Sequence, residues 1–151
     1  MSVSMTLDAP AELDGRAQLE RLMAAGRRPG MVELLDFDLV EVGDGRAAFE
    51  GAPSLSVYNP IGSVHGGCAA TLLDSACGCA VQTKLSARQG YTTLELKVAY
   101  HRRMSDDTGP VRAEGKVVSV GRRAAFAEAK LTDREGRLYA SATSTLLVFD
   151  R

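Results

Sequence analysis

The chain has 151 residues, of which 45% are hydrophobic and 25% charged, and its formal net charge is −1. This balance is typical of one soluble domain with its own hydrophobic core, and it argues against a protein that binds duplex nucleic acid. The N-terminus shows no apolar run of signal-peptide length, and no run of about 18 apolar residues could form a transmembrane helix. We therefore expect a cytoplasmic protein with no membrane partner.

Three cysteines lie close together in an apolar stretch, at positions 68, 77 and 79. Their odd number and short spacing argue against a disulfide framework. We interpret Cys68, Cys77 and Cys79 as small buried hydrophobic residues. Only two histidines are present, which argues against a His-rich metal site. Neither a metal nor a cofactor is expected.

The N-terminal third is predicted to contain a helix and a hairpin. No regular structure is predicted for residues 1–10, whereas apolar residues from Ala11 to Ala25 partly follow helical spacing. Glycine and proline end this helix by position 30, and one further helical turn is expected over Met31–Leu35. Between Phe37 and Gly51, two apolar runs flank Gly43-Asp44-Gly45, which is typical of a β-hairpin.

A long helix is predicted from Gly66 to about Lys84, after a turn-rich loop over residues 59–65. Its apolar residues cover nearly the whole circumference, which indicates a helix buried on all sides. Asp74 lies in the middle of this helix. Because burying an unpartnered carboxylate is costly, Asp74 is either paired structurally or retained for chemistry.

The remainder is predicted to form antiparallel strands. These are Tyr91–Tyr100, Val111–Val120, Ala124–Leu131 and Leu138–Phe149. In the first strand, period-2 alternation places Leu94, Leu96, Val98 and Tyr100 on one face and Thr93, Glu95, Lys97 and Ala99 on the other. The predicted fold class is α+β, with one sheet curled around one long helix.

The start of the long helix is a candidate oxyanion site. Its first N–H groups lack partners within the helix, and Gly66 and Gly67 would let a carbonyl approach the backbone closely. The alternative is that these glycines serve only close packing. Gly66 and Asp74 are eight residues apart, which is about 12 Å along a helix. If both act on one carbonyl, they must come from two chains of a two-fold dimer.

Several motifs carry a family resemblance. The run Asn59-Pro-Ile-Gly-Ser-Val-His65-Gly66-Gly67, then Ala70-Thr-Leu-Leu-Asp74, and the later run Thr92-Thr-Leu-Glu-Leu-Lys-Val-Ala-Tyr100 resemble the hot-dog thioesterases of the phenylacetate-degradation (PaaI-like) branch. The runs Val120–Arg123 and Ala142–Val148 are similar as well. The resemblance spans about residues 30–149, which implies a single hot-dog domain over 1–151. Residues 1–30 match the family weakly, and we expect them to form an N-terminal helical extension.

The resemblance implies dimers, often paired into tetramers, that hydrolyse coenzyme A thioesters at sites across the dimer interface. The family's helix carboxylate, a nucleophile or general base, matches Asp74, and the amide that polarises the thioester carbonyl matches Gly66. A loop asparagine that orients substrate or water matches Asn59. The hydroxyl that assists the water matches Thr93, with Thr92 as the alternative.

Other residues are weaker candidates. His65 could orient the loop or act as a base, and Gly67 and Thr92 could contact substrate. Arg122 and Arg123 could bind the CoA phosphates. The neighbourhood of Arg102 and Arg103 departs from the family, in which a proline often stands near Arg103, so their role stays open.

Two other functions compete with hydrolysis. A non-catalytic acyl-CoA binding or sensing domain could share the same fold. A dehydratase would need a histidine and a carboxylate in one site, and the position of His101 at the end of a strand argues against this function. The sequence leaves the acyl group open. The expected partners are acyl-CoA and further copies of the chain.

Overall fold

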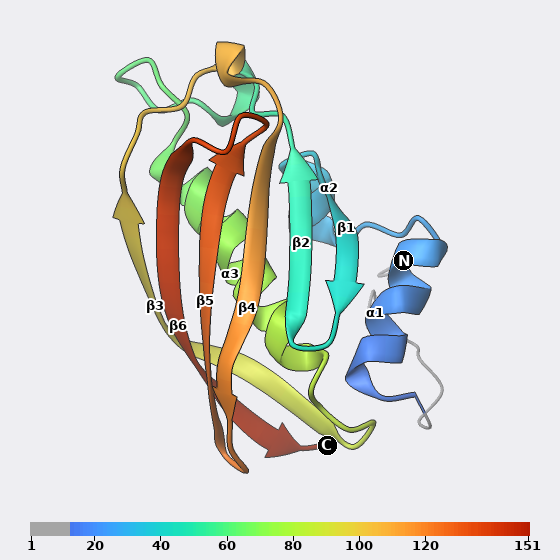
Figure 1. The fold of residues 1–151 in the computed structure, drawn as a ribbon. Coiled ribbons are helices and arrows are strands. Elements are labelled where there is room, and N and C mark those ends of the chain that lie inside the picture. The colour runs from blue at the N-terminus through green and yellow to red at the C-terminus, as the bar shows by residue number, and fades with distance from the viewer. Residues whose placement is uncertain (1–12) are drawn as a thin grey trace.

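The computed structural model describes residues 13–151 (Figure 1). The expectations for residues 1–10, and for a helix start at Ala11, lie outside the described residues. The elements are α1 (Gly15–Ala24), α2 (Gly30–Leu34), β1 (Phe37–Gly43), β2 (Arg46–Gly51), α3 (Gly66–Gln82), β3 (Gln89–Tyr100), β4 (Val111–Val120), β5 (Ala124–Asp133) and β6 (Leu138–Asp150). Short 3-10 turns occupy Leu55–Val57 and Asp106–Thr108.

The six strands form one antiparallel sheet in the order β1-β2-β4-β5-β6-β3, which curves around α3 (Figure 1). Small residues let the helix lie close to the sheet. A Cβ at Gly115 on β4 would stand 2.1 Å from the Ala76 carbonyl oxygen of α3. Ala125, Ala127 and Ala129 of β5 face the same layer and are buried. The predicted α+β arrangement of one sheet around one helix is confirmed.

Helix α3 is buried on most of its surface, but the prediction that it is buried on all sides is wrong for the single chain. Leu73, Ala76 and Val81 are fully buried. Gly67 is exposed, and Thr71, Asp74 and Ser75 are only partly buried. These four positions follow the i, i+4, i+7, i+8 spacing of one helix face. We call this set, Gly67, Thr71, Asp74 and Ser75, the open stripe of α3.

Strand β3 contains an irregularity that changes which side chains face α3. Its pairing with β6 shifts between Thr93 and Glu95, as a β-bulge does. Thr93 therefore faces α3, as does Leu96 beyond the shift, while Leu94 points outward and is 61% exposed. The predicted alternation, with Leu94 and Leu96 on one face and Thr93 on the other, is wrong at this point because one extra residue shifts the phase.

The two short helices pack at the opposite end of the sheet from β3 (Figure 1). Helix α1 is joined to the end of α3, because the Gly15 N–H donates to the Leu85 carbonyl at 2.9 Å and Leu19 is buried. Helix α2 contributes Val32 to the core. Within residues 13–151, no helix has the length and apolar character needed to cross a membrane.

Candidate active site

Asp74 and Thr93 form a hydrogen-bonded pair between the middle of α3 and strand β3. The Thr93 hydroxyl donates to Asp74 Oδ1 at 3.0 Å. Both side chains are partly buried, and Asp74 lies on the open stripe of α3. The pair forms because the β3 bulge turns Thr93 toward the helix, whereas Thr92 is exposed. The structure thus brings Thr93, and not Thr92, to the carboxylate.

The cysteines near Asp74 are held as neutral thiols. Burial, followed by the negative charge of Asp74, raises the pKa of Cys79 to about 12. Burial is also the main cause that raises the pKa of Cys77 to about 12. A thiol with such a pKa carries almost no thiolate at neutral pH, so these cysteines are poor nucleophiles. Among the described residues, no cluster of three or more His, Cys, Asp and Glu side chains could hold a metal ion.

The start of α3 has one backbone donor already used and one free. His65 caps the helix, and its Nδ1 accepts a hydrogen bond from the Gly67 N–H at 2.8 Å. Within residues 13–151 the Gly66 N–H donates to no protein acceptor. The Tyr100 hydroxyl of β3 donates to the Gly66 carbonyl at 2.7 Å and so fixes this residue. Tyr100 was missed as a site residue, and its place on the helix-facing side of the predicted strand was the available signal.

Asn59 organises the loop that leads into α3. Its Oδ1 accepts from the N–H groups of Ile61 and Ser63, both at 3.1 Å, and its Nδ2 donates to the Ser63 hydroxyl at 3.1 Å. These bonds make a side-chain-stabilised turn. Arg103 donates to the Gly62 carbonyl of the same loop. Within residues 13–151 the Asn59 side chain therefore bonds to its own loop and makes no hydrogen bond to Asp74, and Arg103 is a further anchor of that loop.

Arg122 and Arg123 lie in the turn between β4 and β5, away from both groups of residues described above. Both are exposed, and neither makes an ion pair with any residue between 13 and 151. They border a hollow of about 360 Å³ that Leu147–Asp150 of β6 also line. Two free guanidinium groups beside a hollow could bind an anionic ligand.

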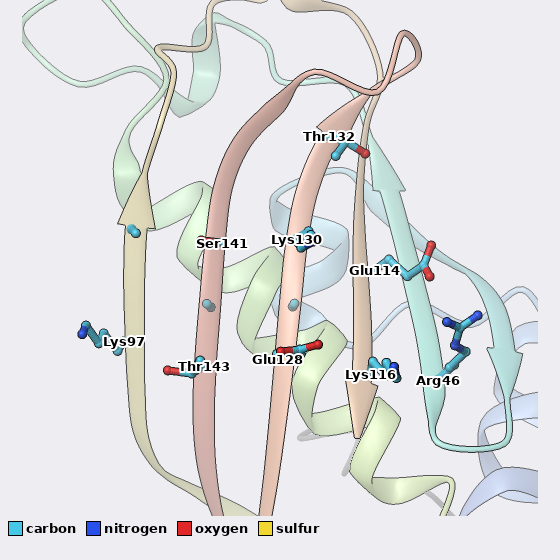
Figure 2. A pocket seen from close by; sticks show the side chains of 12 residues that line it. Arg46, Lys97, Glu114, Lys116, Glu128, Lys130, Thr132, Ser141 and Thr143 are labelled. Atoms are coloured by element: carbon cyan, nitrogen blue, oxygen red, sulfur yellow. The ribbon is translucent and has the colours of Figure 1, made fainter. Parts of the chain in front are cut away.

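A larger hollow, of about 670 Å³, lies on the outer face of the sheet (Figure 2). Acidic and basic side chains from β2, β3, β4 and β5 alternate there, and β6 adds hydroxyl groups. The labelled residues are Arg46, Lys97, Glu114, Lys116, Glu128, Lys130, Thr132, Ser141 and Thr143. This surface is separated from Asp74 by the sheet itself. Interleaved charges of both signs are typical of a solvated sheet face, so we do not place the reaction here.

Comparison with known proteins identifies the family. The family model of the thioesterase superfamily matches residues 61–140, which include the helix start, Asp74 and Thr93. The chain belongs to the thioesterase superfamily. Its fold is the hot-dog fold predicted from the resemblance. Membership supports a thioester hydrolase. No curated protein matches the sequence.

Solved structures agree with this assignment. A conserved protein from Pseudomonas aeruginosa is 30% identical, with 81% of this chain and 95% of that chain covered and a TM-score of 0.75. A thioesterase family protein from Silicibacter pomeroyi is 24% identical, with coverages of 88% and 98% and a TM-score of 0.78. The E. coli PaaI protein from the phenylacetic acid degradation operon is 15% identical, with coverages of 87% and 92% and a TM-score of 0.76. The last two show that the fold is shared.

Proposed function

We propose that this thioesterase hydrolyses acyl-CoA thioesters to free acid and CoA, with Asp74 as the catalytic carboxylate. The observation that carries the proposal is the placement of Asp74. It is the one ionisable side chain on the open stripe of α3 within an otherwise buried helix, and Thr93 holds one of its oxygens. A carboxylate at that position gains nothing for packing and is suited to chemistry.

The hydrogen bond from Thr93 leaves Asp74 Oδ2 available for reaction. As a nucleophile, Asp74 would attack the thioester carbonyl carbon and expel the CoA thiolate, and water would then cleave the mixed anhydride. As a general base, it would take a proton from a water molecule that attacks the same carbon. In both routes the carbonyl oxygen gains negative charge in the transition state, so the site also needs a donor for that oxygen.

The Gly66 N–H is the donor that we assign to the developing oxyanion. It lies at the N-terminus of α3, where the helix dipole favours negative charge, and it is free within the described chain. Asn59 and His65 support this position through the loop and the helix cap. We assign Gly67 and Thr92 to substrate contacts, and Arg122 and Arg123 to the CoA phosphates.

A complete site requires two chains, because Gly66 and Asp74 are eight residues, or about 12 Å, apart on α3. Strand β3 is a 12-residue edge strand with one side unpaired. Antiparallel pairing of two β3 edges across a two-fold axis would place two α3 helices side by side with their open stripes facing each other. We propose a dimer, or a dimer of dimers, with Gly66 of one chain beside Asp74 of its partner.

The test is thiol release from a panel of short, long and aromatic acyl-CoAs, with wild type beside Asp74→Asn. The variant keeps the shape of the side chain and removes its charge. We expect a loss of about 10²-fold or more in kcat with an unchanged circular dichroism spectrum. Asp107→Asn, an exposed substitution on the 3-10 turn Asp106–Thr108, serves as the matched control.

The same panel separates hydrolysis from binding alone. If wild type releases no thiol from any member but binds CoA esters, the protein is an acyl-CoA binding or sensing domain. Asp74 would then be a structural residue paired with Thr93.

A further inference from the structure

A cavity of about 270 Å³ lies between the α1–α2 segment, the β1–β2 hairpin and the side of α3. Its walls are mainly apolar, with side chains contributed by both short helices and both hairpin strands. They include Leu22, Met23, Met31, Val32, Leu39 and Phe49. Apolar walls around a concave space are typical of sites for small apolar groups.

The cavity adjoins the Asp74–Thr93 pair. Ser75 and Cys79 line it, and they follow Asp74 by one and five residues on α3. Tyr91 also lines it, two residues before Thr93 on the helix-facing side of β3. Burial is the main cause that raises the pKa of Tyr91, and the nearby Asp74 carboxylate adds to it. An acyl group whose carbonyl lies at Asp74 therefore has an apolar space beside it.

Resting on the proposed function, we infer that this cavity holds the acyl group of the substrate and limits it to a compact, apolar chain. A group the size of a water molecule occupies about 30 Å³ in a condensed phase, so the cavity accommodates about nine heavy atoms. Acyl groups of about six to nine carbons fill it, whereas long-chain acyl groups exceed it.

Arg28 lines the cavity at the α1–α2 connection, and we assign it to limiting the space open to the acyl chain. The guanidinium donates to both carboxylate oxygens of Asp38 at 2.6 Å and to Asp36 at 2.9 Å. Arg28 and Asp38 both line the cavity. The ion pair ties the α1–α2 segment to β1. A longer acyl chain would have to displace or desolvate these charges, which is unfavourable.

The experiment uses S-alkyl CoA thioethers, which carry the same chain but have no cleavable bond. Calorimetric Kd values are measured for alkyl chains of about two to fourteen carbons with the full-length protein. For wild type we expect Kd to fall roughly three- to fourfold per methylene. This trend should stop at about eight or nine carbons.

Substitutions of lining residues should change the chain length at which Kd stops falling. Leu22→Trp fills the cavity and should shorten the longest useful chain by about three carbons, and Met31→Trp, at a position 56% exposed, provides a second filling variant. Arg28→Ala removes this side chain from the lining and should allow longer chains to gain affinity.

Two exposed substitutions outside the cavity are the controls. Leu34→Trp, on α2 but outside the cavity lining and 79% exposed, is the matched control for the tryptophans. Arg16→Ala, which removes the Arg16–Glu20 pair on α1, is the control for Arg28.

The outcomes separate this inference from the proposed function. If Kd stops falling at the same chain length in all folded variants, the acyl-cavity inference is overturned, even if the enzyme hydrolyses acyl-CoAs. If that chain length changes as expected, the cavity is the acyl-binding site. Absence of thiol release from the matching thioesters would then count only against hydrolysis.

Discussion

The hydrogen bond from Thr93 to Asp74 is the contact that orients the proposed catalytic carboxylate. Hydrogen bonds to charged groups contribute about 1.5–3 kcal/mol. Thr93→Val keeps the volume of the side chain and removes the donor. We expect kcat to fall about 10- to 100-fold, while KM changes little because the cavity and the CoA contacts are intact.

The measurement is steady-state thiol release at several substrate concentrations. Thr93→Ser restores the hydroxyl and should recover most of the activity. Thr92→Val alters an exposed neighbour that does not contact Asp74, so as a substrate contact it should change KM and leave kcat nearly unchanged. Equal losses in Thr93→Val and Thr92→Val would contradict a specific role for Thr93.

At the scale of single residues, the sequence predicts some site members better than others. Asp74 is conspicuous because a carboxylate interrupts an apolar helix. Thr93 emerges from the family resemblance, since period-2 alternation alone places it on the wrong face. Tyr100 and Arg103 reach Gly66 and Gly62 from positions 34 and 41 residues away in sequence. Period-2 alternation indicates only the face on which Tyr100 lies, and no local pattern indicates either contact.

The elements were predictable where local signals are strong. Glycine and proline signals delimit the hairpin, and Val111–Val120 has the predicted bounds. Helix α3 starts at Gly66 as expected because His65 caps it. The β3 bulge could not be predicted, because the extra residue is defined only by pairing with β6. That one residue decides that Thr93 faces the helix.

The turn between β5 and β6 carries a buried carboxylate network that should make stability depend on pH. Burial would raise the pKa of Asp133, but hydrogen bonds from the Arg137 backbone and side chain and from the Tyr139 hydroxyl outweigh it. They hold the pKa at about 2. Because the unfolded value is about 3.9, this stabilisation is complete above pH of about 4 and is lost as the pH falls through about 2.

We therefore expect the difference in Tm between wild type and Asp133→Asn to be large at pH of about 6 and to shrink as the pH approaches about 2. Thermal unfolding monitored by circular dichroism across this range measures the difference. Asp107→Asn, at an exposed position, should show little difference at any pH. A Tm difference for Asp133→Asn that stays constant from pH of about 6 to about 2 would refute the assignment.

At the scale of the whole molecule, two features of the single chain point to a partner. The open stripe leaves the face of α3 that carries Asp74 partly uncovered, and β3 leaves a long edge unpaired. One dimer with paired β3 edges would cover both. The spacing of Gly66 and Asp74 and the resemblance both led us to expect oligomers, whereas the open stripe became visible only in the structure, because helical periodicity indicated burial all round.

Each proposed site takes Gly66 from one chain and Asp74 from its partner. Dimers that contain two different variant chains should therefore have activities that a site within one chain would not give. Asp74→Asn in one chain and Gly66→Pro in its partner remove the carboxylate and the N–H of the same site, so the other site keeps both groups. Proline suits the first position of a helix, and the extended backbone of His65 is compatible with a following proline. Gly66→Ala is the matched control, because it retains the N–H and meets the same Tyr100 side chain, 3.0 Å from the added Cβ.

The most direct measurement is therefore thiol release by mixed dimers purified through two different tags. Pairing an Asp74→Asn chain with a Gly66→Pro chain leaves one intact site, so we expect about half of the wild-type activity although each variant alone is inactive. Pairing wild type with the double variant should leave no intact site and almost no activity. The reverse pattern, with the first dimer inactive and the second about half active, would show that each site lies within one chain and would contradict the account.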